Sequence, residues 1–296
     1  MSPFDHRDAA AGAKAGGGAA NNVTLRIASA AVLAPIAIGF AYIDGWLFLA
    51  LCAAAAAGIL WEWTRLVADH PDRRVLLPGF ATLLAALLLT GFNEPGAAAA
   101  TIVIGAALAG GTMVALPRRF PARNPVGWAA GGILYAGIAF LGPAVLRTDA
   151  ALGFTAVLFV ALTVWATDIF AYMVGRAVGG PLLWPEISPH KTWAGAIGGL
   201  LGGVAAGTLV AYASGIGTLA AIGVIALLLS LLTQVGDLFE SAVKRRFGAK
   251  DASHLIPGHG GLMDRLDGFL VAGFAALLIG LIRAGIAAPA EGLLVW

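Results

Sequence analysis

The side chains best able to do chemistry lie in a polar stretch near the end of the chain, residues 234–268. On a helix turning about 100° per residue, Asp237, Ser241 and Lys244 fall within about 60° of one another. A carboxylate, a hydroxyl and an ammonium group would therefore project from one helix face. Asp264 and Asp267 are spaced i and i+3, so they share a face of the next helix. This pairing of acids and bases indicates a site for a hard cation and for phosphate groups.

The number of acids in this stretch sets it apart from an ordinary basic loop. Four aspartates and five bases stand in about 30 residues between apolar segments. Mg²⁺ binds through a few carboxylates together with substrate phosphates, which predicts Asp237, Asp264 and Asp267 as its ligands. The sequence leaves the number of cations open. The bases would supply charge to the same phosphates, Arg as a bidentate fork and Lys as a point charge, and they include Lys244, Arg245, Lys250 and Arg265.

A hard cation with phosphates predicts phosphoryl-type transfer, in which positioning and charge neutralisation do most of the catalysis. The plainer alternative is a solvated loop with a cluster of basic residues. A glycine-rich turn, Pro257 to Gly261, favours the site, because small residues let the backbone approach a ligand closely. His259 within it would either contact a phosphate or cap the turn.

A second polar segment, Ser188-Pro189-His190-Lys191-Thr192, precedes an apolar stretch. Ser188-Pro189 interrupts any helix, and Lys191-Thr192 then begins the next one. Free backbone N–H groups at a helix start, beside a Lys and hydroxyls, can bind phosphate. This predicts Ser188, Lys191 and Thr192 as substrate-binding residues, although Lys191 alone could simply anchor the chain at the membrane interface.

Asp168 lies inside an apolar segment, where a carboxylate costs about 2.5–3.5 kcal/mol at the bilayer centre. It stands two turns before Arg176. Two interpretations stay open: Asp168 pairs with Arg176 or another base at the helix end, or it lines a polar cavity.

The elements that must position these residues are membrane-spanning helices. Of the 296 residues, 59% are hydrophobic and 11% are charged, with a mean hydropathy of +0.88. A soluble domain carries about a quarter charged residues, and a disordered chain lacks such an apolar excess. The composition therefore predicts an integral membrane protein. We expect it to be all-α and polytopic, and we expect no nucleic-acid partner.

A helix needs about 20 apolar residues to cross the hydrocarbon layer. Nine segments qualify: about 26–43, 46–63, 75–92, 97–116, 127–146, 150–173, 193–214, 217–236 and 267–288. With the N-terminus in the cytoplasm, this arrangement puts 16 of the 18 basic residues on the cytoplasmic side, as the positive-inside rule requires. Only Arg147 and Arg283 fall outside, and the C-terminus would lie outside as well.

The chain divides into three predicted parts. Residues 1–22 form a disordered tail, residues 23–160 the N-terminal membrane helices, and residues 161–296 a C-terminal catalytic membrane region.

The polar motifs resemble a known signature. Ser241-Ala242-Val243-Lys244-Arg245, Lys250-Asp251 and Ile256 through Asp267 match the pattern of phosphatidate cytidylyltransferases, with the family's spacing across 27 positions. Gly236 through Glu240, Ser188 through Thr192, and the segment with Asp168, Tyr172, Gly175 and Arg176 support the match. The resemblance covers roughly residues 165–270.

This resemblance implies an all-helical membrane enzyme that uses Mg²⁺, with CTP and phosphatidic acid as substrates. It also implies a location in the bacterial inner membrane, surrounded by the lipid bilayer, and often a homodimer. Asp237 and Asp264 would hold metal with Asp267 close by, while Ser241, Lys244 and Arg245 would contact phosphate. Where the family commonly has Glu after Lys-Thr-Trp, this chain has Ala194, which puts in doubt an acidic role at that position.

The mechanism that the resemblance implies is attack by the lipid phosphate on the α-phosphorus of CTP, with loss of pyrophosphate. Two rival functions stay open. A transporter would place charges near mid-bilayer and show repeated halves. A polyprenol or isoprenoid-alcohol kinase would share the nucleotide and metal chemistry but would release CDP.

Overall fold

Eight helices in the computed structural model are long and apolar enough to cross a membrane, among the residues that it describes, 32–43, 45–116, 122–253, 255 and 260–296. They are α2 (Gly45–Ala68), α3 (Arg73–Gly91), α4 (Pro95–Ala115), α5 (Pro125–Thr148), α6 (Gly153–Val178), α7 (Trp193–Ala213), α8 (Leu219–Arg246) and α9 (Met263–Ala284). A shorter apolar helix, Val32–Ile43, precedes them.

These helices confirm the all-α, polytopic fold predicted from composition. Eight of the nine predicted spans each correspond to one long helix, and the first corresponds to Val32–Ile43. The beginning of that first span and the predicted tail, residues 1–22, lie outside the described residues.

Local sequence explains where several helices begin. Asp72 precedes α3, and its side chain accepts a hydrogen bond from the Arg74 N–H at 2.9 Å. Asn124 caps α5 in the same way through the Gly127 N–H, at 2.9 Å. Pro125 occupies the first turn of α5, where a missing N–H costs nothing. Short polar segments therefore turn the chain sharply between consecutive spans.

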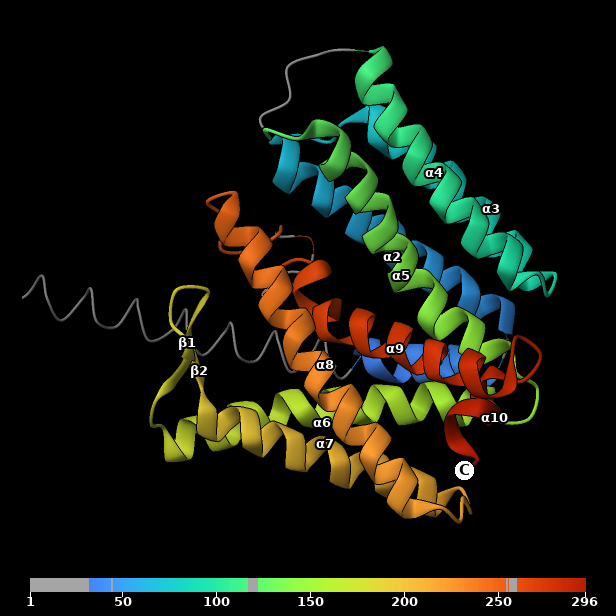
Figure 1. The fold of residues 1–296 in the computed structure, drawn as a ribbon, viewed down its shortest axis with the longest axis vertical. Helices are drawn as coiled ribbons and strands as arrows, with labels where there is room; N and C mark the ends of the chain where they lie inside the picture. Colours follow the sequence, from blue (N-terminus) through green and yellow to red (C-terminus); the bar gives the residue numbers. More distant parts are fainter. Residues whose placement is uncertain (1–31, 44, 117–121, 254, 256–259) are drawn as a thin grey trace, which may run out of the picture.

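The close approach of α6 and α7, side by side in Figure 1, depends on glycine. A Cβ at Gly195 would lie 2.7 Å from the Ala171 carbonyl oxygen, and one at Gly199 would lie 2.9 Å from the Thr167 carbonyl oxygen. The glycines spaced four residues apart in α7 thus form a helix-packing face.

A second close contact joins α8 to α9. A Cβ at Gly236 would lie 2.7 Å from the Asp267 carbonyl oxygen, and one at Gly268 would lie 3.0 Å from the Thr233 carbonyl oxygen. Each glycine is the immediate neighbour of an acid, Asp237 or Asp267. The packing that brings the two backbones together therefore also brings those two acids together.

The structure differs from the sequence prediction in the segments outside the hydrocarbon layer. Residues 182–192, predicted as loop, form an antiparallel hairpin of β1 (Leu182–Trp184) and β2 (Ser188–Thr192). The helix α8 ends at Arg246 rather than at 236, and α9 begins at Met263 rather than at 267. Apolar length detects only the part of a helix that crosses lipid, whereas both helices continue through polar turns. A short helix, α10 (Pro289–Leu294), follows α9.

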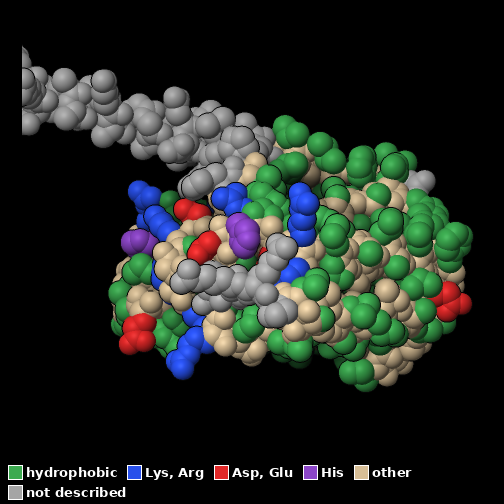
Figure 2. All heavy atoms as spheres, turned by 90° about the horizontal axis from the view of Figure 1, so that it is seen from above, with side chains coloured by type: hydrophobic (Ala, Val, Ile, Leu, Met, Phe, Trp, Pro, Cys, Tyr) green, Lys and Arg blue, Asp and Glu red, His purple; other side chains and the backbone are tan. Residues whose placement is uncertain are grey.

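Charged side chains are not spread evenly over the molecule. Figure 2 shows Lys, Arg, Asp and Glu side chains gathered over one part of a face, while hydrophobic side chains cover most of the remainder. An apolar belt with charge at one end suits a protein surrounded by lipid.

Candidate active site

A cavity of about 710 Å³ lies between α6, α7, α8, α9 and the hairpin. Four separate stretches of the sequence, in α6, β2, α8 and α9, contribute polar side chains to its wall. These side chains are Asp168, Tyr172, Arg176, Ser188, His190, Lys191, Thr192, Gln234, Asp237, Lys244, Asp264, Arg265 and Asp267.

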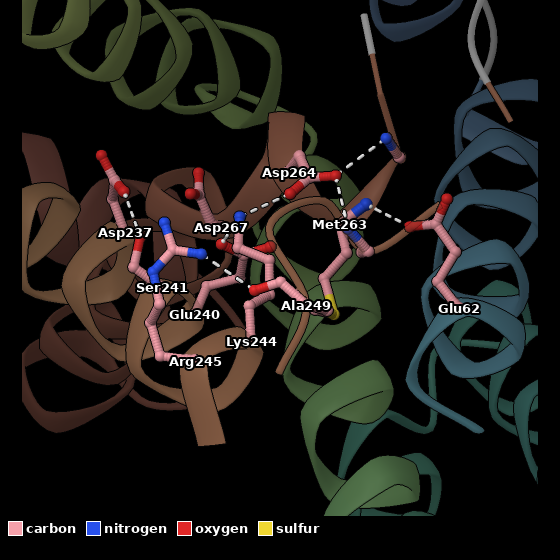
Figure 3. A network of polar contacts seen from close by, with 12 residues as sticks. Glu62, Asp237, Glu240, Ser241, Lys244, Arg245, Ala249, Met263, Asp264 and Asp267 are labelled. Atoms are coloured by element: carbon pink, nitrogen blue, oxygen red, sulfur yellow. Dashed lines mark hydrogen bonds and ion pairs between the residues drawn. The ribbon is translucent and has the colours of Figure 1, made fainter. Parts of the chain in front are cut away.

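The acids of α8 and α9 lie in one row at this cavity. Figure 3 shows the carboxylates of Asp237 and Asp267 pointing the same way from their two helices, whereas that of Asp264 is turned toward Lys244. Asp267 accepts a hydrogen bond from the Gly268 N–H at 2.7 Å. Asp237 forms an ion pair with Lys191 on β2 and accepts a longer hydrogen bond from Ser241 Oγ at 3.4 Å. The predicted clustering of these three acids is therefore present in the fold.

Lys244 lies between two carboxylates. Its Nζ is 2.5 Å from Glu240 Oε2 on the same helix and 2.5 Å from Asp264 Oδ1 on α9. Glu240 is 1% exposed and Lys244 is 9% exposed, so the pair is held away from water. Buried charges persist only when they are paired, and this arrangement fixes the ammonium group at the cavity wall.

The second oxygen of Asp264 binds backbone rather than side chains. Asp264 Oδ2 accepts hydrogen bonds from the Ala252 N–H at 3.0 Å and from the Gly261 N–H at 2.8 Å. Gly260 beside it has a φ of +85°, a conformation that favours glycine. The Asp264 side chain thus joins Ala252, which follows α8, and Gly261, at the end of the glycine-rich turn, to the start of α9.

The opposite wall comes from α6, the hairpin and the start of α7. Thr192 caps α7 by accepting a hydrogen bond from the Gly195 N–H at 3.1 Å. Arg176 donates to the Tyr172 hydroxyl at 2.9 Å. Asp168 lies on the cavity wall, and the ion pairs among the described residues include none between Asp168 and Arg176. The structure therefore places Asp168 as the cavity-lining interpretation expects.

Other predicted site residues stand apart from the wall. Ser241 contacts Asp237 from behind, and Arg245 donates to the Ala249 carbonyl at 2.9 Å at the end of α8. Lys250 is exposed and does not line the cavity. His259 lies outside the described residues. For these four, substrate contact stays a prediction.

Sequence reasoning missed several residues of this region. His190 and Gln234 line the cavity, and Glu240 holds Lys244. Glu62 of α2 accepts hydrogen bonds from residues at the start of α9, about 200 positions away in the sequence. A signal for Glu62 existed, because an acid inside an apolar span marks a functional position by the same rule that drew attention to Asp168.

The predicted magnesium site can be judged by its donors. No group of three or more His, Cys, Asp or Glu side chains converges on a metal position in the part of the chain that the structure describes. Mg²⁺ commonly takes only one or two carboxylates and completes its shell with substrate phosphates and water. All three predicted ligands lie on the cavity wall, and Asp237 and Asp267 suit that role. Both Asp264 oxygens already bind protein groups, Lys244 and two backbone N–H groups, so Asp264 as a metal ligand stays a prediction. The donor chemistry fits the ion when phosphates supply its remaining ligands.

The fold and cavity define a class: a helical, polytopic membrane protein whose charged cavity suits phosphate groups and a hard cation. Comparison with known proteins gives the family. The profile of the cytidylyltransferase family matches residues 24–282, and the chain belongs to that family.

Similar curated proteins carry one name. The chain is 40% identical over 264 residues to "Phosphatidate cytidylyltransferase" of Brucella abortus biovar 1 (strain 9-941), covering 89% of this chain and 95% of that protein. It is 33% identical over 247 residues to the protein of the same name from Bacillus subtilis (strain 168), covering 81% and 91%. The match to the Staphylococcus aureus (strain COL) protein is 41% over 140 residues, covering 47% and 52%.

Proposed function

We propose that this chain transfers the cytidylyl group of CTP to phosphatidic acid, giving CDP-diacylglycerol and pyrophosphate. The observation that carries this proposal is the charged cavity, whose wall combines four acids with four bases. These are Asp168, Asp237, Asp264 and Asp267, and Arg176, Lys191, Lys244 and Arg265. Similarity over most of the length of relatives named for this activity supports it.

The chain's own residues would act mainly by positioning and by neutralising charge. Lys191, Lys244 and Arg265 face a cavity large enough for a nucleotide's phosphates, and each cation would offset part of their charge. Lys244 is held in place by Glu240, so its ammonium group needs little reorganisation when charge develops. The Tyr172–Arg176 pair on α6 adds a hydroxyl and a guanidinium group on the facing wall.

In this reaction an oxygen of the lipid phosphate forms a bond to the α-phosphorus of CTP, and the bond from that phosphorus to the bridging oxygen breaks. The electron pair leaves on pyrophosphate. A phosphate monoester is already anionic near neutral pH, so a strong general base is not required. A Mg²⁺ ion held by Asp237 and Asp267 would supply charge neutralisation to the triphosphate.

The proposed setting is the bacterial inner membrane, with the cavity at the cytoplasmic surface and the C-terminus on the other side. The basic residues that alternate with the spans support this orientation. Homodimer formation is part of the proposal through the family resemblance, and cross-linking in membranes tests it.

Product analysis tests the activity. Purified chain in phosphatidic acid vesicles, with Mg²⁺ and CTP labelled in the cytidine, should yield CDP-diacylglycerol and an equal amount of pyrophosphate. Asp264→Asn should lower turnover by about 100-fold or more. Release of CDP with a phosphorylated lipid would instead identify a kinase, and vectorial uptake without product would identify a transporter.

A further inference from the structure

A glutamate of the N-terminal half binds the start of α9. Glu62 of α2 is fully buried, at 0% exposed, and does not line the cavity. Its Oε1 accepts hydrogen bonds from Ser253 Oγ at 2.5 Å and from the Leu262 N–H at 2.8 Å, and its Oε2 accepts one from the Met263 N–H at 2.6 Å. Figure 3 shows the Glu62 carboxylate facing this turn, on the side away from Asp237.

The two amides belong to a helix start that has no cap of its own. The residue preceding α9 is Leu262, which makes no side-chain hydrogen bond to the helix. The first N–H groups of a helix have no partner within it, and the helix dipole favours a negative charge beside them. Glu62 satisfies two of these groups from a different helix, so α2 caps α9.

The surface of α2 is shaped to receive this turn. Gly58, one turn before Glu62, leaves room for the Leu262 side chain, since a Cβ at Gly58 would lie 2.8 Å from Leu262 Cδ2. A Cβ at Gly261 would lie 2.9 Å from both Glu62 oxygens and 2.9 Å from Asp264 Oδ2. The turn is thus held between two carboxylates, Glu62 on one side and Asp264 on the other.

We propose that Glu62 is a positioning residue for the reaction. By fixing residues 261–263, it sets where Asp264 and Asp267 lie relative to the acids of α8. The distance along the chain from Leu262 to Asp264 is only two residues, so a shift of the turn moves the Asp264 carboxylate directly. The kinetic test of this proposal rests on the proposed function, whereas its test by hydrogen exchange does not.

A matched control exists at the other end of the molecule. Asp149 is 6% exposed and also binds two helix starts through its carboxylate. It accepts from the Ala151 and Leu152 N–H groups, both at 3.0 Å, and from the Ala290 and Glu291 N–H groups at 3.1 and 3.2 Å. A purely structural cap should behave like Asp149, whereas a positioning residue should not.

The experiment compares Glu62→Gln, Ser253→Ala and Asp149→Asn in the full chain, reconstituted in phosphatidic acid vesicles. Glu62→Gln should lower kcat/KM by about 100-fold, with a higher KM for CTP, because small misplacements of catalytic groups have effects of that order. Ser253→Ala removes one of three hydrogen bonds and should cost about 3-fold. Asp149→Asn should keep the wild-type KM values even if it lowers thermal stability. A loss of folded protein lowers the apparent kcat, but the molecules that remain folded keep the same KM.

Hydrogen exchange supplies a readout that does not need activity. In Glu62→Gln, amides of residues 260–268 should exchange faster than in wild type, while those of α5 and α6 should not. Unchanged exchange there, or an unchanged KM for CTP, would overturn the proposal. A wild-type chain that makes no CDP-diacylglycerol would refute the proposed function alone, because the exchange comparison would still decide the role of Glu62. If Glu62→Gln does not insert into the membrane, the same two measurements are made on Ser253→Ala and Gly58→Ala.

Discussion

The two ends of the helix bundle use charge in opposite ways. At the end with Asp149, charged groups bind backbone: Asp149 caps α6 and α10, and Arg147 donates to the Ala41 carbonyl. Arg283 donates to the Gly292 and Val295 carbonyls, both at 2.7 Å, and its guanidinium lies 3.6 Å from the Trp296 ring centroid.

At the cavity end, some charged groups bind backbone too, but several also bind one another. Asp237 pairs with Lys191, and Lys244 pairs with both Glu240 and Asp264. A charge committed to backbone is fixed when the chain folds, whereas a charge paired with another side chain can exchange that partner for a ligand. The difference teaches that buried charge marks a site only when its partners can be replaced. Glu62 is instructive because it binds backbone, as Asp149 does, yet lies at the cavity end.

The largest expected effect comes from removing a cavity acid that holds no backbone group. Asp237→Asn should lower turnover by about 100- to 1,000-fold, because its carboxylate faces the cavity and its bonds among the described residues are to the Lys191 and Ser241 side chains. The thermal unfolding midpoint should stay close to wild type. Turnover with labelled CTP and a detergent melting curve measure both quantities, and wild-type turnover would remove Asp237 from the site.

The next effect separates stability from activity at Lys244. Lys244→Met leaves Glu240 buried without its cation and should cost about 3–5 kcal/mol of unfolding free energy. The double variant Lys244→Met/Glu240→Gln should recover most of that stability but none of the lost activity. Denaturant unfolding in detergent, run beside the turnover assay, tests this, and recovery of both quantities would show that Lys244 is only a structural partner of Glu240.

A smaller effect is expected at the α6–α7 contact that carries the facing wall. Gly199→Ala would place a methyl group 2.9 Å from the Thr167 carbonyl oxygen and should destabilise the fold by about 1–3 kcal/mol. Gly111→Ala is the matched control, because a Cβ at Gly111 in α4 meets nothing within 4 Å. Equal melting temperatures for the two variants would contradict the close packing of α6 and α7.

The smallest effect should come from the opposite end. Arg283→Gln loses the contact with the Trp296 ring and part of its bonding to carbonyls, and should cost about 1 kcal/mol or less. Its turnover should equal that of wild type at temperatures where both are folded. A clear loss of activity would show that the two ends are coupled, against the contrast drawn above.

The membrane spans were the part most readily predicted from sequence, because apolar length directly reports the thickness of the hydrocarbon layer. That rule does not predict the continuation of α8 to Arg246 or the start of α9 at Met263, because those turns are polar. The β1–β2 hairpin was not predicted either, because its short strands and its prolines are typical of a loop.

The site was predicted in part. Helical spacing placed Asp237 beside Lys244 on one face and Asp264 beside Asp267 on another, and the structure brings all four to one cavity. The number and spacing of charges do not predict that Arg245 donates to the Ala249 carbonyl or that Lys250 is exposed to solvent. The contacts of Glu62 with the start of α9 depend on the packing of α2 against α9, which local spacing does not encode.

The hydrogen bonds from the start of α9 to Glu62 of α2 limit which fragments of this protein could be functional. All the motif residues lie in the second half of the chain, which suggests that this half could be used alone as a catalytic unit. A fragment beginning after α4 would lack Glu62 and would start its last long helix with the Leu262 and Met263 amides unbonded. The motif residues carry the chemistry, but a fragment that keeps them would also need α2, whose Glu62 lies 200 residues before Leu262.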